Sequence, residues 1–455
     1  MFREPVRSLV WAAAALAVSA GPAEAQQQAP PPIRPLGALT GVASESLASV
    51  AAVVPVARGR VYVNDITARR LLLFDSGLTR ATVVADSTGS PEAYGSSPGT
   101  LLPFRGDSAL FISPSTLSML VLSPEGGVAR VMAAPPSERM GPLGLIGNIF
   151  GTPGFDARGR LAFYQPIMMV MQGPVSAGGT LNMQPPDSAL VVRFDFASRT
   201  LDTVGAIRIP RTRTTMNRDD SGRPTGVTVS AIPAATVDDW AVTSDGAIAI
   251  VRGRDYHVDW LSSAGGWTST PRMAFAWERL DDDRKNALLD STVAALQVAM
   301  DSNYARQQRA LAAGGAPGRD GPAAGGAGGG GMMVVTMRAE GAPPGAGGGG
   351  DRPAVTRMSM PRPTVARAEL ADVPDYGPPF GQGAVRADAE GGLWVRTSTR
   401  AGGQPVYDVV SRQGVVVDRV QLPVFRTIAG FGPGVVYLGV RDSVGTVHLE
   451  RARIR

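Results

Sequence analysis

Short runs of apolar residues alternate with turns rich in Gly, Asp and Ser through most of the chain. In Gly59–Leu78, GRVYVNDITARRLLLFDSGL, a glycine turn leads into one apolar strand, and a polar turn at Asn64-Asp65 leads back into a second strand. Alternation places Val61 and Val63 on the same side of the first strand. This pattern predicts a β-hairpin.

The same pattern recurs five more times, with different residues each time. The glycines that open the six copies are Gly59, Gly106, Gly159, Gly246, Gly392 and Gly434. They are 47, 53, 87, 146 and 42 residues apart, and three of these intervals match the roughly 40 to 50 residues of a four-stranded propeller blade. The two longer intervals hold insertions, the first of which interrupts the third copy before Asp187. We therefore predict an all-β chain folded as a six-bladed β-propeller rather than as a sandwich.

The chain is expected to divide into six segments. These are a signal peptide (1–25), a Pro-rich leader (26–38), blades 1–4 with a closing N-terminal strand (39–277), an insertion helix (278–313), a flexible Gly/Pro-rich insertion (314–368) and blades 5–6 (369–455). The helical and Gly-rich insertion thus falls between blades 4 and 5.

The first residues have the three parts of a secretory signal peptide. Arg3 and Arg7 precede an apolar run from Leu9 to Ala20, and Ala23-Glu24-Ala25 forms a small-x-small cleavage site. The run is shorter than the roughly 20 residues that span a membrane, which disfavours an uncleaved anchor. We expect an exported protein, periplasmic or secreted, whose leader (26–38) runs extended along the surface without packing.

The insertion after the fourth copy predicts one helix. Asp281 can cap its N-terminus, Asp282 and Asp283 suit the positive end of the helix dipole, and Gly314 can end it. Apolar residues at steps of three or four form one face: Leu289, Val293, Leu296, Met300 and Tyr304. We expect this face to rest on the propeller's rim, and the alternative is a helix that binds a partner.

The glycine-rich segment that follows predicts a flexible linker. A phosphate-binding glycine loop needs a strand before it and a helix after it, and this segment has neither pattern. Within it, Met332–Arg338, MMVVTMR, is β-prone and could pair with a sheet edge or stay exposed as an adhesive segment.

Composition narrows the classes of partner. The 455 residues include no cysteine, which excludes disulfides, and the formal net charge of +5 is small for this length. Arg211–Gly226 is a mixed-charge stretch without interleaved aromatic residues, which favours a solvated loop over a nucleic-acid site. We expect no nucleic-acid partner, no transmembrane segment in the mature chain, and a monomer.

Two groups of residues are candidates for a binding site. Alternation places Asp255, His257 and Asp259 on one strand face, where they could bind a divalent ion, but a charge-paired histidine on an outer strand is favoured. His448, the other of the two histidines, is interpreted as structural. The tryptophans could line a sugar- or peptide-binding funnel, but most are expected to be blade core. They are Trp240, Trp260, Trp267, Trp277 and Trp394.

The stretches DYHVDWLSSAGGW, DAEGGLWVR and GTVHLERARI resemble the exported six-bladed β-propellers of bacteria, which are related to NHL and TolB-like repeat proteins. The resemblance extends from about Gly59 to the C-terminus and is strongest in the last two copies. It implies that an N-terminal strand, between Ile33 and Val56, completes the last blade, because an open blade would expose an unpaired edge. It implies no single chemistry.

We predict a non-catalytic binding or scaffolding propeller of the cell envelope that presents a rigid face to a protein or small ligand. The alternative is a metal-dependent hydrolase or lactonase, similar to the gluconolactonase and regucalcin propellers, which needs convergent Glu, Asn and Asp ligands in the axial channel. Asn64, Asp65 and Asn148 could supply only part of that set, and no G-x-S-x-G nucleophile motif occurs. We assign no catalytic, cofactor-binding or metal-binding residue, and no cofactor.

Overall fold

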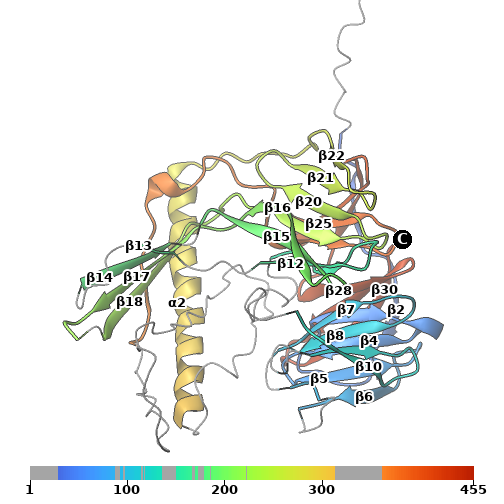
Figure 1. The fold of residues 1–455 in the computed structure, drawn as a ribbon. Coiled ribbons are helices and arrows are strands. Elements are labelled where there is room, and N and C mark those ends of the chain that lie inside the picture. Colours follow the sequence, from blue (N-terminus) through green and yellow to red (C-terminus); the bar gives the residue numbers. More distant parts are fainter. Residues whose placement is uncertain are drawn as a thin grey trace, which may run out of the picture.

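The computed structural model describes residues 29–87, 93–95, 98–113, 116, 118–135, 150–165, 170–172, 179–184, 186–221, 223–312 and 361–455. The predicted signal peptide, Asn148 and Met332–Arg338 lie outside these residues. The described residues form seven β-sheets and one α-helix, which confirms that the chain is mostly β (Figure 1).

Six of the sheets in the described residues share one plan, in which four antiparallel strands lie side by side. The first sheet is β3 (Ala52–Pro55), β4 (Val61–Asp65), β5 (Arg70–Phe74) and β6 (Ala81–Ala85). The second is β7 (Thr100–Pro103), β8 (Ala109–Ser113), β9 (Ser118–Leu122) and β10 (Val128–Ala133). The third is β11 (Gly154–Phe155), β12 (Leu161–Tyr164), β15 (Ser188–Asp195) and β16 (Thr200–Arg208).

The other three sheets of this plan come from the second half of the chain. The fourth is β19 (Asp239–Val242), β20 (Ile248–Arg252), β21 (His257–Leu261) and β22 (Trp267–Ser269). The fifth is β24 (Phe380–Ala387), β25 (Leu393–Ala401), β26 (Gln404–Val410) and β27 (Val416–Gln421). The sixth is β28 (Arg426–Gly432), β29 (Val435–Arg441) and β30 (Val447–Arg453), with β2 (Leu39–Val42) as its fourth strand.

These sheets follow one another around a ring. Their first strands contact in sequence, because β28 contacts β3, β3 contacts β7, β7 contacts β11, β11 contacts β19, and β19 contacts β24. An apolar cluster fills each interface between consecutive sheets, and one cluster joins the last sheet to the first through Leu72, Phe74, Tyr437 and Leu449. Radial repetition of small antiparallel sheets is the arrangement of a β-propeller.

Each hairpin predicted from the sequence supplies the two middle strands of one sheet. In the first copy these are β4 and β5, which pair from Val61 opposite Phe74 to Asp65 opposite Arg70. The glycine before the second strand has a positive φ in most copies, for example 79° at Gly246, where a Cβ would lie 2.2 Å from the backbone nitrogen of Ala157. The predicted turn at Asn64-Asp65 was placed too early, since both residues belong to β4 and the turn spans residues 66–69.

The N-terminal segment closes the ring. β2 pairs antiparallel with β30, within the range expected for a closing strand. The expectation that the leader does not pack is wrong, because β1 (Ile33–Pro35) pairs in parallel with β27 at the edge of the fifth sheet. Proline is tolerated at such an edge, where its missing N–H leaves no partner unsatisfied.

The seventh sheet lies outside the ring, and we call it the side sheet. Its order is β13 (Val170–Gln172), β14 (Gly179–Gln184), β17 (Thr212–Arg218), β18 (Pro224–Ala231) and β23 (Thr364–Val365). The expectation of a solvated loop at Arg211–Gly226 is wrong, because most of this stretch forms the β17–β18 hairpin. The strand that partners β17 comes from the insertion inside the third copy, and the local sequence holds no sign of that pairing.

The helix α2 (Asp282–Ala312) runs beside the side sheet (Figure 1). As predicted, Asp281 caps it, since Oδ1 of Asp281 accepts a 2.9 Å hydrogen bond from the backbone nitrogen of Arg284. Leu289 is buried against Leu280 and Val373, close to the short helix η2 (Leu370–Asp372). At Leu289 the apolar face therefore packs on Leu280 before the helix and on the chain that returns to the ring, and this cluster contains no residue of the six ring sheets. Within the described residues, no helix is long and apolar enough to cross a membrane.

Candidate functional site

Asp239 opens β19 and points its carboxylate toward the fifth sheet. It is 1% exposed, and its Oδ2 accepts a 2.8 Å hydrogen bond from the backbone nitrogen of Val385 in β24. Burial raises the pKa of Asp239 to about 6, and the Val385 N–H and the Arg386 guanidinium limit the rise. Among the described first strands of the ring, Asp239 is the one acidic residue, so these strands do not bring several carboxylates together.

The carbonyl oxygen of Val385 accepts hydrogen bonds from two segments of the ring. Thr152, which bridges to β19, donates its hydroxyl to this oxygen at 3.3 Å, and Nη1 of Arg386 donates to it at 2.8 Å. The same Nη1 also donates to the carbonyl oxygen of Gly383 at 3.1 Å. Gly383 has a φ of 68° inside a stretch where the β24–β25 register shifts, and such bulges redirect neighbouring side chains. The bulge thus turns Arg386 back along its own strand.

Arg386 belongs to a cationic group on one face of the fifth sheet. Arg386 in β24 lies opposite Trp394 in β25. Arg396 is two residues further along β25 and lies opposite Tyr407 in β26. Cross-strand neighbours share a face, so Arg386, Arg396 and Tyr407 all point toward the sixth sheet. We call these three residues the arginine site.

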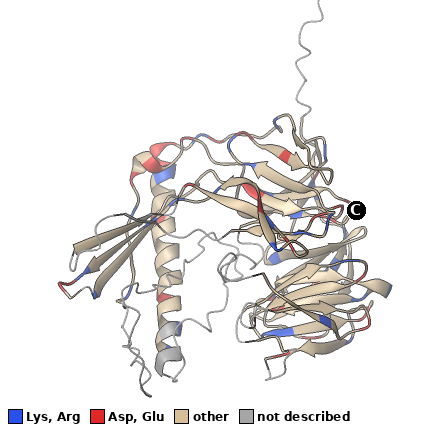
Figure 2. Ribbon diagram, viewed as in Figure 1, with Lys and Arg blue, Asp and Glu red and all other residues tan. Residues whose placement is uncertain are grey.

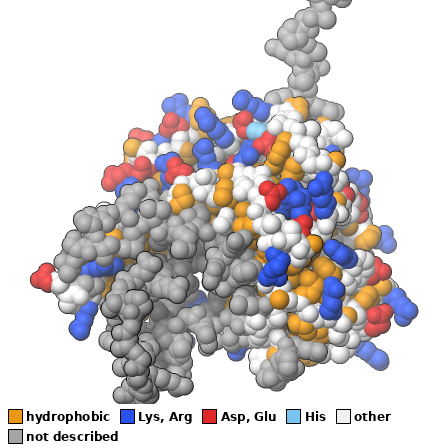
Figure 3. Space-filling view, in the orientation of Figure 1, with side chains coloured by type: hydrophobic (Ala, Val, Ile, Leu, Met, Phe, Trp, Pro, Cys, Tyr) orange, Lys and Arg blue, Asp and Glu red, His pale blue; other side chains and the backbone are white. Residues whose placement is uncertain are grey.

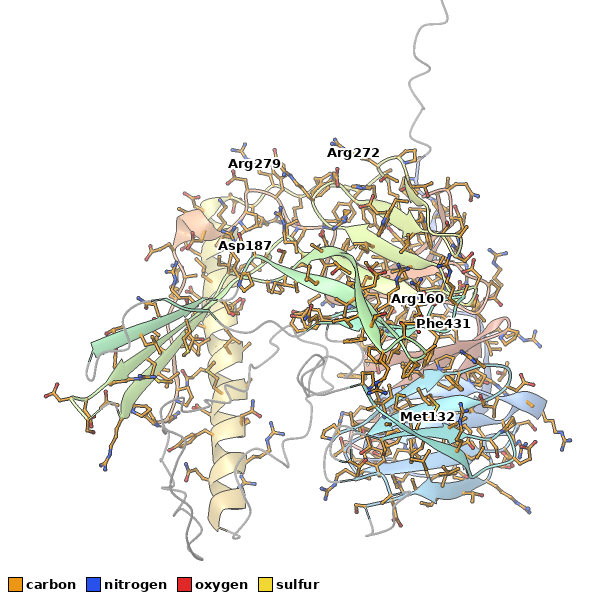
Figure 4. The ribbon with its side chains drawn as sticks, viewed as in Figure 1. Met132, Arg160, Asp187, Arg272, Arg279 and Phe431 are labelled. Atoms are coloured by element: carbon orange, nitrogen blue, oxygen red, sulfur yellow. The ribbon has the colours of Figure 1, made fainter. Side chains whose placement is uncertain are left out.

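The walls of the arginine site are aromatic. The Trp394 ring lies 5.2 Å from the ring of Phe431 in β28 and 6.2 Å from that of Tyr407 (Figure 4 labels Phe431). Burial lowers the pKa of Arg386, and the neighbouring charge of Arg396 lowers it further, while Asp239 and Tyr407 act in the opposite direction. Burial raises the pKa of Tyr407. The site can therefore donate several hydrogen bonds from a partly buried, positively charged position.

Sequence reasoning did not identify the arginine site. Its two arginines stand in AVRADAEGGLWVR, of which DAEGGLWVR carries the family resemblance and predicts only a turn and a strand, and Tyr407 follows on the next strand. A local signal does exist, since Arg396 directly follows the buried apolar run Leu393–Val395 that begins the strand. What the sequence lacked was the side of the sheet that each arginine faces.

The predicted group around His257 is brought together, but as an ion-pair network. Nδ1 of His257 lies 2.7 Å from Oδ1 of Asp255, and Nε2 lies 3.2 Å from Oδ1 of Asp259. Arg252 donates to Oδ2 of Asp259 at 2.7 Å, and Ser269 donates to its Oδ1 at 2.5 Å. Burial alone would raise the pKa of Asp259, but these two donors lower it below its ordinary value. The geometry is that of the charge-paired histidine, and in the described part of the chain no three acidic or histidine side chains are grouped to hold a metal ion.

Asn64 and Asp65 have structural partners. The Asn64 side chain donates to the carbonyl oxygen of Gly99 at 2.9 Å and accepts from the Tyr94 hydroxyl at 2.7 Å. The fully buried Asp65 carboxylate accepts from the backbone nitrogens of Ala48 and Ser49 and from Arg70, at 2.9 to 3.1 Å. Both side chains are therefore used in hydrogen bonds to neighbouring segments of the ring. The third member of that predicted set, at position 148, lies outside the described residues.

The tryptophans divide into two groups. Trp240, Trp260 and Trp394 are 0 to 4% exposed and belong to the clusters between sheets, as expected for blade core. Trp267 and Trp277 are 46% and 40% exposed. They come from the fourth sheet and from the segment that leads to α2, so the five rings do not line a common funnel.

A shallow hollow lies at the start of α2, where acidic and basic residues gather (Figure 2). Arg279 stands at this end of the molecule (Figure 4), and Nζ of Lys285 pairs with Oδ1 of Asp375 at 2.6 Å. The acidic residues Asp281, Asp282 and Asp283 line it as well. They complement the positive end of the helix, which accounts for their presence. Elsewhere on this face, Figure 3 shows positive and negative side chains intermixed.

Comparisons with known proteins found no matching family model and no matching curated protein. Solved structures do match over most of their length. A streptogramin B lyase is 10% identical over 92% of this chain and 87% of its own, with a TM-score of 0.33. A luciferin-regenerating enzyme is 11% identical over 92% of both chains, with a TM-score of 0.34. A putative exported protein from Bacteroides fragilis is 7% identical over 94% and 93%, with a TM-score of 0.36. Likenesses this distant carry no inference about activity.

Proposed function

We propose that this chain is an exported β-propeller that binds a ligand or a partner protein without transforming it. The arginine site is the observation that carries this proposal. Guanidinium groups stay protonated and act as hydrogen-bond donors, so they suit recognition better than proton transfer or nucleophilic attack. Two carboxylates lie near the site and both already accept hydrogen bonds: Asp239 from the backbone of β24, and Asp388 from the Trp394 indole and the backbone nitrogen of Gly392.

The proposal includes the number of blades. Each of the six similar sheets would form one blade, with β2 completing the last, and α2 and the Gly-rich segment would be inserted between blades 4 and 5. Membership of the NHL and TolB-like group is part of the same proposal, and it rests on the repeated Gly-turn hairpins. Export rests on the sequence of residues 1–25.

The side sheet and α2 offer a second surface, suited to a protein partner. They are fastened to one another, since the Gln297 side chain accepts from the backbone nitrogen of Val365 at 3.0 Å and donates to the carbonyl oxygen of Pro363 at 3.3 Å. Recognition surfaces are commonly built from insertions held on a rigid scaffold. We expect the protein to act as a monomer that presents this surface in the cell envelope.

The test begins with protein purified from its own envelope fraction under mild conditions. Native mass spectrometry should show a retained small ligand or a partner protein, and elemental analysis should show no stoichiometric divalent ion. A divalent ion that a chelator removes, together with lactone or ester hydrolysis that disappears with it, would contradict the proposal and support the hydrolase alternative.

A further inference from the structure

The two arginines of the arginine site have no ion-pair partner among the described residues, whereas several other partly buried arginines of the ring do. Four ring arginines with side chains 16 to 26% exposed each form an ion pair within 3.1 Å. These pairs are Arg160–Asp156, Arg252–Asp259, Arg419–Asp408 and Arg426–Glu450. Arg386 and Arg396 are also partly buried, yet neither forms an ion pair with another described residue.

The unpaired donors of the arginine site are not sealed off from solvent. Nη1 of Arg386 is occupied by two backbone carbonyl oxygens, but Arg396 and the Tyr407 hydroxyl donate to no described residue. In the described chain, none of the three residues has a polar atom that is both buried and without a partner. Their free donors therefore face space that solvent can reach.

The two guanidinium groups repel one another in the absence of a ligand. Arg386 lies opposite Trp394, so Arg396 is its diagonal neighbour on the adjacent strand and the same face, at about 7 to 8 Å between Cα atoms. Asp239 balances one charge at most, and it is committed to the backbone of β24. An anion placed between the two arginines would remove the repulsion and complete their hydrogen bonding.

We propose that the arginine site binds the anionic group of a small organic molecule, either a carboxylate or a phosphate. Two arginines and one phenol hydroxyl match the acceptor oxygens of such a group. This inference rests on the proposed function and identifies the chemical class of ligand at that same site.

The experiment measures thermal unfolding and calorimetric binding of the purified full chain with sodium phosphate or sodium succinate, against sodium chloride at equal ionic strength. At least one of the two anions should raise the melting temperature by several degrees, and Arg396→Gln should abolish this rise and weaken the dissociation constant at least tenfold. A response to phosphate alone or to succinate alone identifies the source of the anionic group.

Arg400→Gln is the matched control, because Arg400 lies on the same strand, is exposed, and among the described residues donates only to the carbonyl oxygen of Gly403. It should respond to the anions as the parent protein does. Tyr407→Phe keeps the aromatic packing and should weaken binding severalfold, so it tests the site even if Arg396→Gln fails to fold. Without anion, Arg396→Gln should melt no lower than the parent, because it removes a like-charge contact.

The inference is overturned if neither anion binds the parent protein, or if Arg396→Gln and Tyr407→Phe bind as the parent does. In that case a ligand or partner recovered from the envelope would still support the proposed function, since it could occupy the side sheet. If the anions do not bind and no ligand or partner is recovered from the envelope, the inference and the proposed function are both overturned.

Discussion

Arg34 holds Asp418 across 384 residues of sequence. Nε of Arg34 donates to Oδ1 of Asp418 at 3.0 Å, and Nη2 donates to Oδ2 at 2.5 Å and to the carbonyl oxygen of Ile454 at 2.8 Å. One side chain in β1 thus ties the N-terminal segment to the fifth sheet and to the C-terminus. The ring is closed by a charged side chain in addition to the β2–β30 pairing.

Replacing Arg34 by alanine should therefore destabilise the whole ring. Asp418 is 12% exposed in its side chain, and it would lose a bidentate partner. Charged hydrogen bonds of this kind contribute about 1.5 to 3 kcal/mol, and we expect a loss of that size in the free energy of unfolding. Urea denaturation measures it. Arg80→Ala is the control. Arg80 is exposed, and it accepts a hydrogen bond from Asp75 through its backbone oxygen, which alanine keeps. This substitution should change the free energy of unfolding by less than about 0.5 kcal/mol.

The closing segment also depends on a close backbone approach at Gly37. A Cβ at this position would lie 2.5 Å from the carbonyl oxygen of Arg453, the last residue of β30. We expect Gly37→Ala to push β2 away from β30 and to lower stability by about 1 to 3 kcal/mol. Limited proteolysis should then cleave the N-terminal segment faster. Gly381→Ala is the control, since a Cβ there meets nothing within 4 Å and should leave proteolysis unchanged.

The hairpins could be predicted from sequence because their contacts are local. In Gly59–Leu78 the two strands, their turn and their alternation lie within one short window, and the β4–β5 pairing follows. The contacts that could not be predicted join distant segments. The Arg34–Asp418 pair and the β14–β17 pairing unite residues whose own neighbourhoods contain no sign of the partner.

The arginine site escaped prediction for a related reason. Alternation shows that Arg396 and Trp394 share a face, but it does not show which neighbouring sheet that face meets. Arg386 depends further on the bulge near Gly383, which shifts the register between Phe380 and Val385. The function of a propeller depends on the face that each side chain occupies and on local bulges, and the repeated hairpin pattern predicts neither.

Asp239 should make stability depend on pH. Its folded pKa of about 6 exceeds the ordinary value of 3.8, so the folded chain holds the proton more tightly than the unfolded chain. The stability from the protonated carboxyl is fully present below about pH 4 and is lost as the pH rises through about 6. The shift corresponds to roughly 3 kcal/mol.

Asp239→Asn removes this titration while keeping an oxygen that can accept from Val385. Between pH 4 and pH 7.5, the parent protein should lose about 2 to 4 kcal/mol relative to the variant, measured by chemical denaturation at each pH. Asp75→Asn provides a control that should not change the pH slope. Hydrogen bonds from Thr79 lower the pKa of Asp75 below its ordinary value of 3.8, so its contribution is lost only below the measured pH range. Equal pH slopes in the parent and in Asp239→Asn would contradict the assignment.

The docking of α2 can be tested on its two faces. Leu289 is 1% exposed in the cluster with Leu280 and Val373, whereas Val298 on the same helix is 68% exposed. We expect Leu289→Ala to weaken docking by about 2 to 4 kcal/mol, because it leaves a cavity, and Val298→Ala to change it by less than about 0.5 kcal/mol. Amide hydrogen exchange along α2 measures both, with the ring strands as an internal reference. If Leu289→Ala leaves the protection of α2 unchanged, the apolar face is not held by the returning chain, and the helix is free to bind a partner.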